Sequence, residues 1–165
     1  MHREISYTDQ TFRRESNLSL YAFTALIGIL IGLDLWPLVA AWLDPALMAR
    51  WMCPGDTHSA TVELDPRVGG TFRIVMHHAR GDEKHWGEYL AIEPPSRLSF
   101  TWISAHTDRR PSVVTVELSG RGADTELVLT HRRLPPDKVE AHRGGWSDIV
   151  AKLDAVLART GRLPP

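Results

Sequence analysis

The sequence has one cysteine, almost no net charge and none of the common catalytic signatures. Because Cys53 stands alone, no internal disulfide and no tetrahedral cysteine site for a metal can form. Nineteen Lys and Arg residues against 20 Asp and Glu residues leave a formal charge of −1, so we predict no nucleic-acid partner. The sequence also lacks a Gly-x-Ser-x-Gly elbow, a phosphate-binding loop and a dinucleotide fingerprint.

The chain does have the size and balance of one globular domain. It contains 165 residues, of which 43% are hydrophobic and 24% are charged. This composition provides enough apolar surface for a core and excludes a disordered chain. We expect a polar N-terminal tail over residues 1–16, one domain over 17–160 and a short tail over 161–165. A lone cysteine is typical of a reducing compartment, which predicts a cytoplasmic protein.

Residues 16–33 carry no charge, and three interpretations of this run stay open. A strand would be covered on both faces, with aromatic and β-branched side chains on one and leucines on the other. A helix would reach about 27 Å, slightly short of the roughly 30 Å hydrocarbon core of a membrane. The third interpretation is a cleaved signal peptide. We favour the strand, and we expect no membrane association.

Two short helices and six strands are predicted to follow. The spacing over residues 34–52 is helical, and Asp44 can cap a second helix whose first residue is Pro45. The apolar pattern then alternates, and turn residues recur at short intervals, which is typical of antiparallel strands. The predicted strands span residues 60–64, 71–78, 85–92, 97–104, 112–118 and 125–132.

A long amphipathic helix is predicted after Asp137, which can act as its cap. Its apolar residues recur at spacings of three and four, as in one face of a helix. Gly144 and Gly145 interrupt that pattern, and each costs about 1 kcal/mol relative to alanine. We expect one of two reasons for them, either close approach of the helix to a strand or room for a ligand.

The order of these elements predicts an α+β fold, because consecutive strands without crossover helices cannot form a parallel sheet. Motifs in the same order resemble the Hsp90-ATPase-activator-homologue branch of the START-like, or SRPBCC, superfamily. They are AWLDP at 41–45, DPRVGGTFR at 65–73, GEY at 87–89, EPPSRL at 93–98, FTW at 100–102, VTVEL at 114–118, TELVLTH at 125–131 and GW at 145–146.

This resemblance covers roughly residues 34–160 and implies the helix-grip fold. In that fold a curved, seven-stranded antiparallel sheet surrounds a long C-terminal helix, with two short helices after the first strand and an apolar cavity inside. Members usually begin with a strand that contains a basic residue and ends in Ala-Pro. This chain has an uncharged run followed by Asp34-Leu35 there, so the first strand departs from the family pattern.

The predicted site is the cavity between the sheet and the last helix. Aromatic side chains would supply its walls, and His131 or His142 would offer a polar group to a ligand. The resemblance implies an apolar small molecule as that ligand, and we predict a lipid, a polyketide or an aromatic compound. The candidate lining residues are Trp51, Phe72, Trp86, Tyr89, Phe100, Trp102, His131, His142, Trp146 and Val150.

No catalytic residue, cofactor or metal site is predicted. His77 and His78 are adjacent, so on a strand they point to opposite faces and cannot hold one ion from that strand alone. Two other functions stay open. One is a protein-interaction module that docks on a chaperone, and the other is a cyclase- or hydrolase-type enzyme with a histidine and a carboxylate in the cavity. An incompletely paired first strand would favour a homodimer through the sheet edge.

Overall fold

Strands with alternating apolar side chains form one open antiparallel sheet. The computed structural model describes residues 10–13, 36–121 and 124–160. Neighbouring strands are all antiparallel, in the order β1-β7-β6-β5-β4-β3-β2. The strands are β1 (Gln10–Arg13), β2 (Ser59–Leu64), β3 (Thr71–His78), β4 (Gly81–Glu93), β5 (Arg97–Ser104), β6 (Ser112–Arg121) and β7 (Asp124–Arg132).

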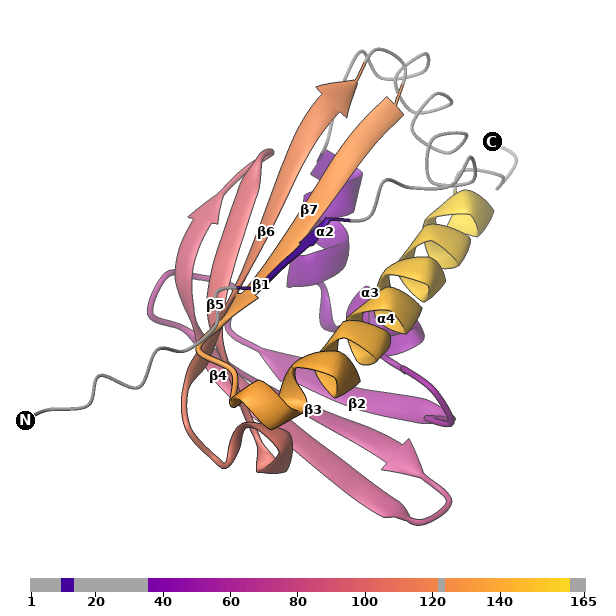
Figure 1. Ribbon diagram of the computed structural model, residues 1–165. Coiled ribbons are helices and arrows are strands. Elements are labelled where there is room, and N and C mark those ends of the chain that lie inside the picture. The colour runs from indigo at the N-terminus through magenta and orange to yellow at the C-terminus, as the bar shows by residue number, and fades with distance from the viewer. Residues whose placement is uncertain (1–9, 14–35, 122–123, 161–165) are drawn as a thin grey trace, which may run out of the picture.

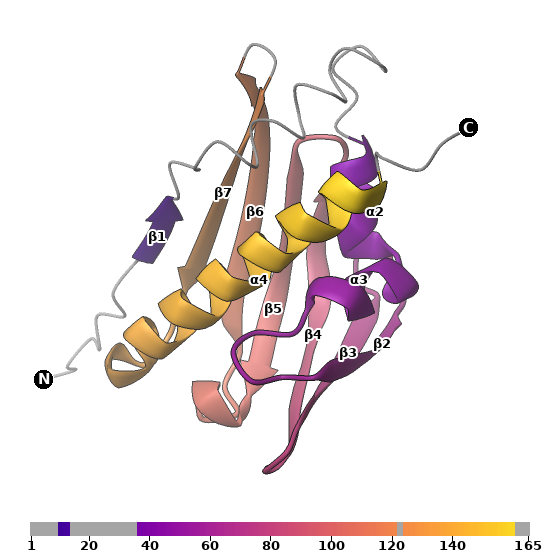
Figure 2. The same ribbon diagram turned by 90° about the vertical axis from the view of Figure 1, so that its right-hand side faces the viewer.

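The described α-helices all lie on one side of this sheet (Figure 1). The longest helix crosses the strands diagonally, and the two shorter helices lie beside its C-terminal half (Figure 2). An α+β fold with an antiparallel sheet and a C-terminal helix fits the predicted helix-grip arrangement. The helices are α2 (Trp36–Leu43), α3 (Pro45–Trp51) and α4 (Val139–Thr160), with short 3-10 turns at η1 (Ala105–Thr107) and η2 (Pro136–Lys138).

The start of α3 follows directly from local sequence. The Asp44 side chain accepts a hydrogen bond from the backbone N–H of Leu47 at 2.7 Å, and Pro45 occupies the first helical position. This arrangement satisfies one of the free N–H groups at the helix start. It also turns Met48 and Trp51 into the core, where both are buried.

The hydrophobic core lies between α4 and the sheet. Ile149, Leu153 and Leu157 of α4 are almost completely buried, and they belong to the same cluster as the inward side chains of β3–β7. Trp42 of α2 and Trp51 of α3 belong to this cluster, and their ring centroids lie 4.7 Å apart. Burial of these large side chains is the main force that holds the helices on the sheet.

The N-terminal part of the chain differs from the sequence-based expectation. Residues 10–13, predicted as part of a polar tail, form β1 and pair with β7, with Gln10 opposite His131. The whole of the uncharged run at 16–33, predicted as the first strand, lies outside the described residues. Within the described ranges, every helix is too short or too polar to cross a bilayer.

Gly87 of β4 occupies a position with no room for a side chain. A Cβ atom there would lie 1.9 Å from the backbone oxygen of Thr101 and 2.7 Å from Cζ of Phe72. The backbone N–H of the next residue, Glu88, donates to Thr101 Oγ1 at 2.8 Å, which holds β4 and β5 together at this point. A side chain at 87 would therefore separate two paired strands.

We predict that Gly87→Ala lowers the free energy of unfolding by about 2 kcal/mol, because overpacking forces the backbone to shift. Urea unfolding at constant pH measures this change. Gly144→Ala is the matched control: no heavy atom lies within 4 Å of a Cβ added at that helical position. It should stabilise the protein by up to about 1 kcal/mol. Equal stability of Gly87→Ala and the parent protein would contradict the steric argument.

Candidate functional site

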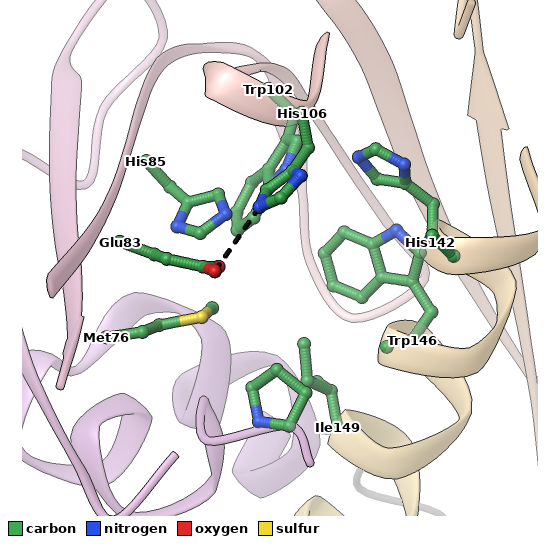
Figure 3. A pocket seen from close by; sticks show the side chains of 11 residues that line it. Met76, Glu83, His85, Trp102, His106, His142, Trp146 and Ile149 are labelled. Atoms are coloured by element: carbon green, nitrogen blue, oxygen red, sulfur yellow. Dashed lines mark ion pairs between the residues drawn. The ribbon is translucent and has the colours of Figure 1, made fainter. Parts of the chain in front are cut away.

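A cavity of about 170 Å³ lies between the N-terminal half of α4 and strands β3–β5. Figure 3 shows the side chains that surround it. Its apolar walls come from Met76 of β3, Trp102 of β5, and Trp146 and Ile149 of α4. Its polar lining comes from Glu83 and His85 of β4, His106 of η1 and His142 of α4, and the remaining lining residues are Pro54, Ala141 and Gly145.

Ordinary strand and helix periodicity brings these residues together. Glu83 and His85 are two positions apart on β4, so both side chains face the same side of the sheet. Met76 is the register partner of Glu83 on β3. On α4, His142 and Trp146 are four residues apart and share a face of the helix.

The rim of the cavity is a carboxylate–imidazole pair. Nε2 of His106 lies 3.3 Å from Oε1 of Glu83, and the two side chains are 52% and 35% exposed. A local cap holds His106, because its backbone N–H donates to Ser104 Oγ at 3.1 Å. A pair of this kind can accept and pass a proton at the entrance of the cavity.

A buried chain of hydrogen bonds joins the two tryptophan walls. Nε1–H of Trp146 donates to Nδ1 of His131 at 3.0 Å. Nε2 of His131 lies 2.8 Å from Oγ of Ser112, and that hydroxyl donates to the backbone oxygen of Trp102 at 2.6 Å. An indole nitrogen can only donate, so Nδ1 of His131 carries no proton and its Nε2–H donates to Ser112. The chain therefore requires a neutral imidazole.

His131 is therefore a positioning residue for Trp146 and Trp102. Its side chain is completely buried, both ring nitrogens have protein partners, and it does not line the cavity. Burial, with a smaller contribution from His142, lowers its pKa from 6.5 to about 3. The prediction that His131 offers a hydrogen bond to a ligand is wrong, because Trp146 and Ser112 already occupy its two nitrogens.

Two of the histidines that line the cavity, His85 and His142, are also neutral. Burial lowers the pKa of His85 to about 3, with smaller contributions from nearby histidines, and its ring packs on Trp102 with centroids 4.7 Å apart. Burial also lowers the pKa of His142, although a hydrogen bond between its Nδ1 and the Lys138 backbone oxygen, at 2.9 Å, acts in the opposite direction. Neither ring is expected to carry a positive charge at neutral pH.

Three of the ten predicted residues line this cavity: Trp102, His142 and Trp146. Three others lie deeper and surround a second void of only about 10 Å³; they are Phe72, Tyr89 and Phe100. Trp51 has no exposed surface, and Val150 is buried but does not line the cavity. These buried residues belong to the packed core of the domain.

Trp86 requires a correction. Its side chain is 39% exposed, whereas His85 and Gly87 on either side of it are buried. Successive side chains of a strand point to opposite faces, so an inward His85 places Trp86 on the outer face. The prediction that Trp86 lines the cavity is therefore wrong.

Several lining residues were absent from the sequence-based set, including Met76, Glu83, His85, His106 and Ile149. Strict alternation along β4 could have identified Glu83 and His85, but the predicted strand began at residue 85 instead of Gly81. Nothing local indicates His106, because only the η1 turn brings it to the cavity. In the described part of the chain, no group of three or more His, Cys, Asp or Glu side chains is placed to hold a metal ion.

Comparison with known proteins gives a family match and many similar folds. A family model described as Activator of Hsp90 ATPase homolog 1-like protein matches residues 38–158. Protein MLL2253 from Mesorhizobium loti is 26% identical in sequence, over 93% of this chain and 98% of that chain, with a TM-score of 0.65. A protein from Rhodobacter sphaeroides is 22% identical over 92% and 93% of the two chains, with a TM-score of 0.67. No curated protein matches this chain.

The neutral state of His131 predicts how stability depends on pH. The folded pKa of about 3 lies below the ordinary value of 6.5, so the unfolded chain binds a proton that the folded chain does not. The contribution of neutral His131 to the free energy of unfolding is complete above about pH 6.5 and decreases as the pH falls toward 3. Between pH 7 and pH 5, His131 alone should account for a loss of about 2 kcal/mol.

Urea unfolding of the parent protein and of His131→Asn at both pH values measures this contribution. The variant should be less stable at pH 7, because the chain between the two tryptophans is disrupted, and it should lose less stability on acidification. His85 titrates in both proteins, so its contribution cancels from the difference. An identical loss in the two proteins would show that His131 does not titrate on unfolding.

Proposed function

We propose that this chain, which belongs to the Activator of Hsp90 ATPase homolog 1-like protein family, binds a small apolar molecule in the cavity beneath α4. The family supports a ligand-binding or an activator-type module. The cavity itself is the observation that favours ligand binding. It has apolar walls, which include two tryptophans, and a polar rim, as small-molecule sites usually do.

The size of the cavity narrows the proposed ligand. Its volume of about 170 Å³ is close to the roughly 150 Å³ of an apolar protein cavity that accepts benzene. A compound with one aromatic ring would fit in this cavity, in contact with Trp102 and Trp146. A lipid chain or a polyketide would have to extend past the Glu83–His106 rim. Among the three predicted ligand classes, we therefore favour aromatic compounds.

The two adjacent glycines of α4 support this proposal. An added Cβ would meet no heavy atom within 4 Å at either Gly144 or Gly145, so close approach to a strand does not explain them. Gly145 lines the cavity, whereas Gly144 is exposed. Each glycine weakens the helix by about 1 kcal/mol relative to alanine. At Gly145 the missing side chain leaves space in the cavity for a ligand, which is a reason for a glycine there in spite of its cost to the helix.

The activator-type alternative would use a different surface. Trp86 and Leu90 of β4 are 39% and 44% exposed, and both belong to the outward side of that strand. A docking partner would contact that face, whereas a ligand occupies the cavity under α4. Trp86→Ser separates the two functions, since it should leave small-molecule binding unchanged and weaken docking on a partner protein. An enzyme acting in the same cavity would rely on the Glu83–His106 pair, 3.3 Å apart.

We predict that Gly145→Leu blocks binding of p-xylene, because the new side chain occupies the cavity. Gly144→Leu is the matched control: it makes the same change one position away, where the helix faces solvent. Isothermal titration calorimetry, with tryptophan fluorescence as a second readout, measures binding. We expect at least about a tenfold weaker affinity for Gly145→Leu and an unchanged affinity for Gly144→Leu. Equal affinities, or no binding to the parent protein, would contradict the proposed function.

A further inference from the structure

The charged groups around the cavity restrict the charge of the ligand, which the volume of the cavity does not. None of the described residues that line it is Lys or Arg, and Glu83 is the only carboxylate among them. Glu83 already lies beside His106 at the rim. An ionised carboxylate on the ligand would therefore lose its water without gaining a cationic partner. This environment favours a neutral ligand.

His142 supplies a hydrogen-bond acceptor. Its Nδ1 lies 2.9 Å from the backbone oxygen of Lys138, one helical turn earlier. A carbonyl oxygen can only accept, so Nδ1 carries the proton and Nε2 of the neutral ring has a free lone pair. Nε2 is at the end of the ring away from that carbonyl, and His142 lines the cavity beside Trp146 (Figure 3). The lone pair is suited to a ligand that donates a hydrogen bond.

On the basis of the proposed ligand-binding function, we propose that the cavity selects neutral phenols over aromatic carboxylates. The phenol hydroxyl donates to Nε2 of His142, and the ring lies in the cavity against Trp102 and Trp146, whose own rings are in contact with centroids 5.1 Å apart. His85, on the other side of the cavity in Figure 3, adds no charge: its Nδ1 is buried without a hydrogen-bond partner in the described part of the chain. The lowered pKa values of His85 and His142 agree with a cavity that contains neutral imidazoles.

Three compounds that share a p-tolyl group test the selection on the unmodified protein at pH 7.5. They are p-xylene, p-cresol and p-toluate, which place a methyl, a hydroxyl and a carboxylate at one position of the same ring. Calorimetry should show that p-toluate binds at least about tenfold more weakly than p-cresol. Equal binding of p-toluate and p-cresol would overturn the inference.

His142→Phe tests the assigned acceptor, because phenylalanine keeps the ring and removes the lone pair. The affinity for p-cresol should fall about fivefold, the effect of one lost hydrogen bond, while the affinity for p-xylene stays within about twofold. His58→Phe is the matched control, because His58 is exposed and does not line the cavity. Thermal unfolding checks that each variant folds. If His142→Phe does not fold, the comparison of the three compounds on the parent protein tests the inference alone.

The possible failures are distinguishable. If neither p-xylene nor p-cresol binds to the parent protein, the proposed ligand-binding function is wrong. If p-xylene binds and Gly145→Leu blocks it, that function stands. In that case, an unchanged ratio of p-cresol to p-xylene affinity in His142→Phe would overturn only the phenol inference.

Discussion

The hydrogen-bond chain from Trp146 through His131 and Ser112 to the Trp102 backbone determines how α4 sits on the sheet. Hydrophobic burial pulls the helix against the strands, but apolar contacts have little directional preference. A buried polar chain has strict geometry, because each donor must meet an acceptor. These contacts hold one indole of the helix and one strand of the sheet at a defined distance.

The cavity lies beside the hydrogen-bonded contact between Trp146 and His131. The helix is fixed at Trp146, and its neighbour Gly145 has no side chain to occupy the space that remains. Burial also lowers the pKa values of His131, His85 and His142, which keeps these three rings neutral. Burial thus determines both the packing and the charge state of these rings, and the apolar space is lined by the neutral imidazoles of His85 and His142.

Much of the fold was predictable from periodicity and turn residues. Alternation identified β2–β7, and three- and four-residue spacing identified α4, because these patterns follow from backbone geometry alone. The candidate site was only partly predictable. Trp102, Trp146 and His142 were identified, but Trp86 was assigned to the wrong face. The error arose because all aromatic residues near the cavity were grouped together without strict alternation along β4.

The sequence by itself determined the order of the elements, the position of α4 and its glycines, and the absence of a strong net charge, since each depends on local pattern or composition. Only the tertiary structure decided the role of His131, the contribution of Glu83 and His106 to the rim, and the volume of the cavity. These features depend on contacts between residues far apart in the chain. Such contacts are set by how the helix and the strands pack, and no local spacing encodes that packing.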